Sequence, residues 1–115
     1  LNSAERNTGV GIDALDAITS AARNTAIGYR SGGAATTGGF NVFVGDSAGL
    51  LTTTESGIVA VGYGAMDAAS SANDSTGVGN QANRRNKGIR NTAVGSLTLA
   101  GNSSGNKLSQ TEIAV

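Results

Sequence analysis

The sequence repeats itself every 17 residues, and this period constrains the fold more than any other feature of the chain. A pentapeptide ending in glycine occurs as NTGVG (7–11), NTAIG (24–28), NVFVG (41–45), IVAVG (58–62), STGVG (75–79) and NTAVG (91–95). The repeat predicts coils at 7–23, 24–40, 41–57, 58–74, 75–90 and 91–111, with a partial coil at 112–115. We therefore expect residues 1–115 to form one repeat array, a segment of a longer fibre.

A period of 17 residues is too short for a helix-turn-helix repeat, a propeller blade or a leucine-rich repeat. It suits one coil of a parallel β-solenoid, because each pentapeptide is β-branched and short, as strands of such coils are. Equivalent residues then stack at the strand spacing of ~4.8 Å. The sequence predicts an all-β parallel solenoid, or β-roll, of about seven coils. Short helical turns over 12–18 and 64–69 remain an alternative, since both stretches are rich in alanine and free of proline.

Two columns of residues define the predicted coil. The branched residue before each glycine is expected to form the repeat core: Val10, Ile27, Val44, Val61, Val78 and Val94. The glycine itself is expected to form a tight corner: Gly11, Gly28, Gly45, Gly62, Gly79 and Gly95. An asparagine column, at Asn7, Asn24, Asn41 and Asn91, predicts a ladder of stacked side-chain amides.

The middle residue of each predicted strand is small in every copy except one. Gly9, Ala26, Ala60, Gly77 and Ala93 contrast with Phe43. This second strand face is small and apolar, and symmetric self-association is the simplest way to cover it, so we expect a homotrimer. Phe43 should be buried, with Gly38 or Gly39 beside its ring.

Composition excludes several classes of function. The chain has no histidine and no cysteine, so the commonest metal ligand, the commonest general base and the thiol nucleophile are absent. We expect no enzyme activity, no cofactor and no metal. The charge is balanced, with 8 positive and 8 negative residues, which argues against nucleic-acid partners. No apolar run is long enough for membrane insertion.

The charged and hydroxylic residues offer few sites. Arg84, Arg85, Lys87 and Arg90 form a basic cluster, interpreted either as a contact for acidic glycans or as a solvated loop. Asp13 and Arg30 share a column and are expected to pair across neighbouring coils. Two adjacent hydroxyl columns, beginning at Thr19 and Ser20, favour turns with side-chain-to-backbone hydrogen bonds. Ice binding is a weaker alternative, because neighbouring residues of a strand point to opposite faces.

The repeat resembles the head repeats of YadA-like trimeric autotransporter adhesins and the repeats of bacteriophage tail fibres. The nearest copies are NTAIGYRS (24–31), IVAVGYGA (58–65) and NTAVGSLT (91–98). The resemblance implies a trimeric β-roll in a virion tail fibre, with other fibre segments and a host-surface glycan or protein as partners. A bacterial surface adhesin is the alternative, and a tailspike that cleaves glycans with paired carboxylates is the third.

Overall fold

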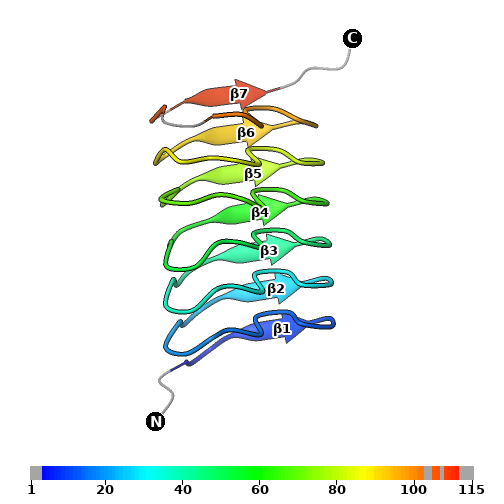
Figure 1. Ribbon diagram of the computed structural model, residues 1–115, viewed down its shortest axis with the longest axis vertical. Helices are drawn as coiled ribbons and strands as arrows, with labels where there is room; N and C mark the ends of the chain where they lie inside the picture. Colours follow the sequence, from blue (N-terminus) through cyan, green and yellow to red (C-terminus); the bar gives the residue numbers. More distant parts are fainter. Residues whose placement is uncertain (1–3, 103–104, 107, 112–115) are drawn as a thin grey trace.

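The structure is a computed structural model that describes residues 4–102, 105–106 and 108–111. This part of the chain is all-β and forms a parallel β-solenoid of about six turns, which confirms the predicted fold class. Its strands are β1 (Thr8–Val10), β2 (Thr25–Ile27), β3 (Val42–Val44), β4 (Val59–Val61), β5 (Thr76–Val78), β6 (Thr92–Val94) and β7 (Ser109–Thr111). Figure 1 shows them stacked along the long axis, one in each coil. The partial coil at 112–115 lies outside the described residues.

Each strand pairs in parallel with the strand of the next coil, in the register that the repeat predicts. The partners of Val42 are Thr25 in β2 and Val59 in β4. The register continues through the 16-residue coil, where Thr76 pairs with Thr92. Backbone hydrogen bonds therefore run along the whole solenoid axis.

The segments after the strands are hydrogen-bonded turns, and the described residues contain no helix. In the fourth coil, Asp67 N donates to Gly64 O (3.2 Å), whereas the neighbouring Met66 N donates to Ala82 O of the next coil (3.0 Å). Residues 12–18 follow the same alternation, since Ala14 N bonds within its coil and Leu15 N bonds to the next one. The helical alternative for both stretches is therefore wrong, because every second amide is used between coils.

The column predicted to form the core lies on the outside of the coil. Val10, Ile27 and Val94 are 56%, 43% and 36% exposed, and Val44, Val61 and Val78 are half-buried. The middle residues Ala26, Phe43, Ala60, Gly77 and Ala93 are buried instead. The molecule measures only 17 Å along its shortest axis, and its narrow interior takes the middle column, which is small except at Phe43, while the branched residues on either side of that column point outward. Within one chain, the predicted inward face was wrong.

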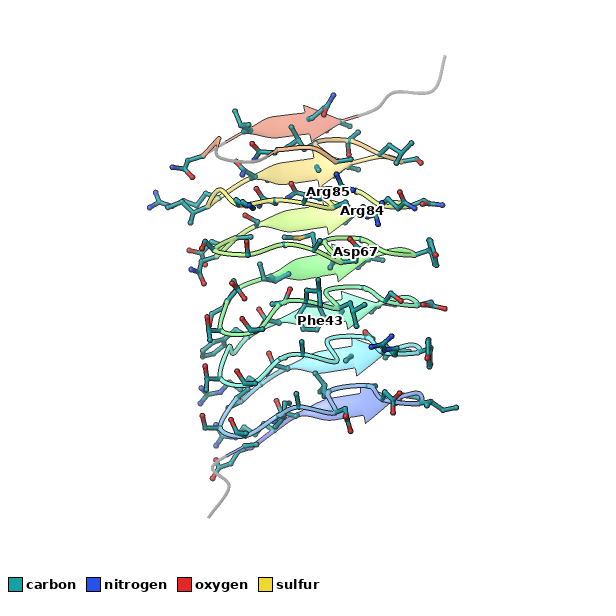
Figure 2. The ribbon with its side chains drawn as sticks, viewed as in Figure 1. Phe43, Asp67, Arg84 and Arg85 are labelled. Carbon is teal, nitrogen blue, oxygen red and sulfur yellow. The ribbon has the colours of Figure 1, made fainter. Side chains whose placement is uncertain are left out.

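Phe43 is fully buried, as predicted, but different glycines make room for its ring. A Cβ on Gly32 would lie 2.5 Å from Phe43 Cδ2, and one on Gly49 would also meet the ring. Figure 2 shows the ring inside its coil. Gly38 and Gly39 instead allow close backbone approach, facing Glu55 O and Ala22 O respectively. The expectation for Gly38 and Gly39 was wrong because the ring points toward the turns at Gly32 and Gly49 rather than toward the preceding spacer.

The glycines that end the pentapeptides form the corners of the coils. Gly11, Gly28, Gly45, Gly62, Gly79 and Gly95 have φ between 121° and 133°. A Cβ on Gly45 would lie 2.6 Å from Gly62 O, and the same close approach recurs from coil to coil. Both the backbone conformation and the stacking distance therefore exclude a side chain at this position.

The asparagine column bonds to the backbone and does not form the expected amide ladder. Asn41 Oδ1 accepts from Ile58 N (2.8 Å) in the next coil, while Asn41 Nδ2 donates to Glu55 O (2.9 Å) at the end of its own coil. Asn7, Asn24 and Asn91 repeat this pattern. Each side chain thus closes one coil and connects it to the next, because backbone groups at this bend lack other partners.

Candidate functional site

The outward face of the stacked strands is the most distinctive surface of the molecule. It is formed by the first and third residues of each strand, since the middle residue points inward in β2–β6. These residues are Thr8, Val10, Thr25, Ile27, Val42, Val44, Val59, Val61, Thr76, Val78, Thr92, Val94, Ser109 and Thr111. We call this surface the strand face; it carries threonine, valine, isoleucine and serine and no charged residue.

The strand face combines exposed methyl groups with hydroxyls and carries no charge. In-register pairing places the third strand residues in a row at ~4.8 Å, so their methyl groups form a continuous ridge from Val10 to Thr111, while the first row mixes hydroxyls with Val42 and Val59. Soluble sheets that face water normally alternate apolar and polar residues and place charges outward. A contiguous exposed apolar patch generally marks an interaction site. The residues of this surface were visible in the sequence as repeat columns. That they point outward became clear only from the structure, in which the middle residue of each strand from β2 to β6 is buried.

Exposed aromatic residues continue the surface past the corner glycines. Tyr29 and Tyr63 directly follow Gly28 and Gly62, and they are 48% and 57% exposed. Backbone bonds hold this column in register, because Ser47 N donates to Tyr29 O (2.9 Å) and Gly64 N to Asp46 O (2.9 Å). The two tyrosines therefore lie two coils apart on one edge. We did not predict a role for them, although their shared repeat position was visible in the sequence.

The basic cluster divides into one paired residue and three exposed ones. Arg84 Nε lies 3.0 and 3.1 Å from the two carboxylate oxygens of Asp67 in the preceding coil. Figure 2 shows the two side chains on neighbouring coils, with Arg85 nearby. Arg85, Lys87 and Arg90 are exposed. Arg84 is thus held by an ion pair, and the other three residues carry the free positive charge of the cluster toward solvent.

Asp13 and Arg30 lie near each other without forming the expected ion pair. Both line a shallow notch together with Asp16 and Gly33. Among the described residues, the ion pair between coils is Asp67–Arg84. Both of its members stand five residues after a corner glycine, whereas Asp13 and Arg30 stand two residues after one. The ion pair between coils therefore lies three positions further from the corner glycine than was expected from the sequence.

In the first hydroxyl column, the side chains of Thr19 and Thr36 bond to the backbone, as the turn interpretation predicts. Thr19 Oγ1 donates to Thr36 O (3.1 Å), and Thr36 Oγ1 donates to Thr53 O (3.2 Å). Residues 103–104, which would end these columns, lie outside the described residues. The threonine hydroxyls at 19 and 36 therefore connect neighbouring coils.

Glu55 is a buried carboxylate with a structural role. Its oxygens accept from Thr53 N (2.8 Å), Thr54 N (3.1 Å) and Ser71 N (2.8 Å). Burial alone would raise the pKa of Glu55, but these backbone N–H groups stabilise the charged form and the pKa is lowered overall. The carboxylate thus stays ionised while it satisfies amides of two successive coils.

Neither a metal site nor a membrane span is found in the described residues. They contain no group of three or more acidic side chains positioned to hold a metal ion. They also contain no helix with the length and hydropathy needed to cross a bilayer. Comparison with protein-family models, with curated proteins and with solved structures found no match to this chain.

Proposed function

We propose that this chain is a structural, non-enzymatic segment of a homotrimeric fibre, namely a virion tail fibre that supports attachment to a host cell. The observation that carries the proposal is the strand face, which is uncharged along the entire solenoid and β-branched from β1 to β6. Three copies of the chain would cover this face by packing their strand faces around a common axis. The valines assigned to the core from sequence would then be buried between chains.

The mechanism of such a segment is mechanical. Every strand donates and accepts backbone hydrogen bonds along the axis, and asparagine side chains such as Asn41 add further links between coils. Corner glycines let neighbouring backbones stack closely, because a side chain at these positions would meet the carbonyl of the next coil. A stiff rod of this kind would join other fibre segments and hold a distal tip that contacts a glycan or protein on the host.

The exposed tyrosines favour a second candidate, the head of an adhesin on a bacterial surface. Tyr29 and Tyr63 offer amphipathic rings on one edge, and such rings are enriched where proteins bind one another. An adhesin head would bind host matrix through this lateral edge rather than through a distal tip. Replacing both tyrosines with serine would remove binding of the isolated segment to matrix proteins only in the adhesin case. Release of oligosaccharides from host polysaccharide would instead indicate the third candidate, a tailspike.

Sedimentation equilibrium with Val61→Asp tests the proposed assembly. The unmodified chain should sediment as a trimer at micromolar concentration, and V61D should sediment as a monomer because three buried charges would face one another. Circular dichroism should show that V61D keeps its β-structure, since Val61 points outward in the single chain. The matched control is Asp46→Asn, which changes an exposed carboxylate on the edge and should leave a trimer. A well-folded monomer of the unmodified chain would contradict the proposal.

A further inference from the structure

A notch opens in the turns of the first three coils, away from the residues of the strand face. It has a volume of about 200 Å³ and is lined by Asp13, Asp16, Arg30, Gly33, Ala34, Leu50 and Leu51. The two carboxylates and one guanidinium give it a formal charge of −1, and the leucines and Ala34 provide apolar walls. None of these residues belongs to the strand face.

The notch exists because one column of side chains is interrupted. The fifth residue after each corner glycine is Asp16, Gly33, Leu50, Asp67, Arg84 and Ala100 along the chain. Gly33 and Arg84 occupy equivalent backbone positions, since Ala17 N donates to Gly33 O (3.2 Å) and Ala68 N donates to Arg84 O (3.0 Å). Where the fifth coil presents an arginine side chain, the second coil presents only a hydrogen atom.

The ion pair between Asp67 and Arg84 shows the kind of partner that Asp16 lacks, namely a guanidinium group from the next coil. Arg84 Nε contacts both oxygens of Asp67, the aspartate one coil below it in this column. Asp16 is likewise the aspartate one coil below Gly33, and it is exposed beside the empty position. A Cβ on Gly33 would lie 3.2 Å from Arg30 O, 3.4 Å from Asp13 O and 3.5 Å from Leu50 Cδ1, so an aliphatic stem placed there would touch the leucine.

We infer that the notch binds an alkyl guanidinium or alkylammonium group, the chemistry that an arginine or lysine side chain presents. The cation takes the position that Arg84 takes over Asp67, with its charge at the Asp16 carboxylate and Asp13 adding to the negative field. The stem lies against Leu50 and Ala34. Arg30, which also lines the notch, carries the same charge as the ligand and competes with it for the carboxylates. Since the site is open to water, we expect a dissociation constant in the millimolar range.

Titration of the isotope-labelled chain with butylguanidinium, butylammonium and neutral butylurea tests this inference by NMR. Butylguanidinium should shift the amide signals of Gly33 and Ala34, and butylurea, which has a similar shape without the charge, should not. Binding of butylguanidinium but not butylammonium would identify an arginine-type ligand; binding of both would identify any alkyl cation. Equal shifts from butylurea, or shifts spread over carboxylates outside the notch, would overturn the inference.

Two variants connect the binding to the named residues. Asp16→Asn should weaken butylguanidinium binding about fivefold, whereas Asp46→Asn, an exposed carboxylate outside the notch, should leave it unchanged. Gly33→Arg should supply the missing guanidinium from within the chain and abolish binding. Unchanged affinity in D16N would show that the notch does not recognise the cation.

Discussion

The ring of Phe43 occupies the space that a side chain on Gly49 would need. The next coil reverses the sizes, because Ala60 stands at the position of Phe43 and Met66 at the position of Gly49. Both Phe43 and Met66 are fully buried. The third coil is thus filled from its strand and the fourth coil from its turn, so the strand position and the turn position of a coil compete for the same volume.

Exchanging the large residue between the strand position 43 and the turn position 49 tests whether the two positions compete for one volume. Phe43→Ala should destabilise the chain by about 3 kcal/mol, because it leaves a cavity. Gly49→Met should also destabilise it, since the added side chain meets the ring. The double variant reproduces the Ala60–Met66 arrangement and should lose less stability than the sum of the single changes. Urea denaturation of all four chains measures the coupling, and additive losses would contradict shared filling.

The corner glycines should tolerate no side chain. Gly45→Ala places a Cβ 2.6 Å from Gly62 O at a φ of 130°, so we expect a loss of about 3 kcal/mol or more. Gly64→Ala is the matched control, because its φ is 60° and its Cβ would lie 3.4 Å from Gln81 Cγ. The control should lose about 1 kcal/mol. Thermal unfolding followed by circular dichroism compares them; similar losses would mean that the stacked carbonyls can move apart.

Asn86 should be among the polar residues most sensitive to substitution. Its Oδ1 accepts from Gly88 N (3.0 Å), Asn91 Nδ2 (2.7 Å) and Asn102 Nδ2 (2.8 Å), and its Nδ2 donates to Gly88 O (2.8 Å) and Ser75 Oγ (3.1 Å). Asn86→Ala leaves several of these buried groups without partners, so we expect a loss of about 3 kcal/mol. Asn80→Ala, at an exposed position of the same coil, should change the free energy of unfolding by less than about 0.5 kcal/mol.

Glu55 should make stability depend on pH. Burial opposes its charge, but three backbone N–H groups hold its pKa below the ordinary value. Its contribution is therefore present above the unfolded-state pKa of about 4.3 and is lost as the pH falls through the lower folded-state pKa. The melting temperature of the unmodified chain should drop more between about pH 7 and pH 3 than that of Glu55→Gln. Glu5→Gln, at an exposed carboxylate, should follow the unmodified chain.

The period of the repeat was sufficient to predict the strands, their register and the parallel stack. It was insufficient to decide which strand face points inward, because a strand of three residues is too short for its alternation of side chains to distinguish the two faces. Val61 on one face and Ala60 on the other are both apolar, so hydrophobicity did not distinguish them. The deciding factor was the thickness of the coil, which depends on the path of the turns.

The candidate surfaces were predictable to different degrees. The turn role of Thr19 and Thr36 followed from local chemistry, since hydroxyls beside a bend bond to nearby carbonyls. The notch could not be predicted from local chemistry, because it arises where Gly33 lacks a side chain between residues of neighbouring coils. Only the alignment of the fifth column, with Arg84 above Asp67, would have pointed to it.

The 16-residue coil shows how the solenoid accommodates a change in length. The bonds of Asn86 close this shortened bend, and Thr76 still pairs with Thr92 as though no residue were missing. Strand pairing involves only neighbouring coils, so each coil behaves as an interchangeable unit. Duplication or loss of a whole coil would lengthen or shorten the rod by one strand spacing, ~4.8 Å, and leave its cross-section unchanged. The gene for such a protein can therefore adjust the reach of the rod in discrete steps through recombination between its own repeats.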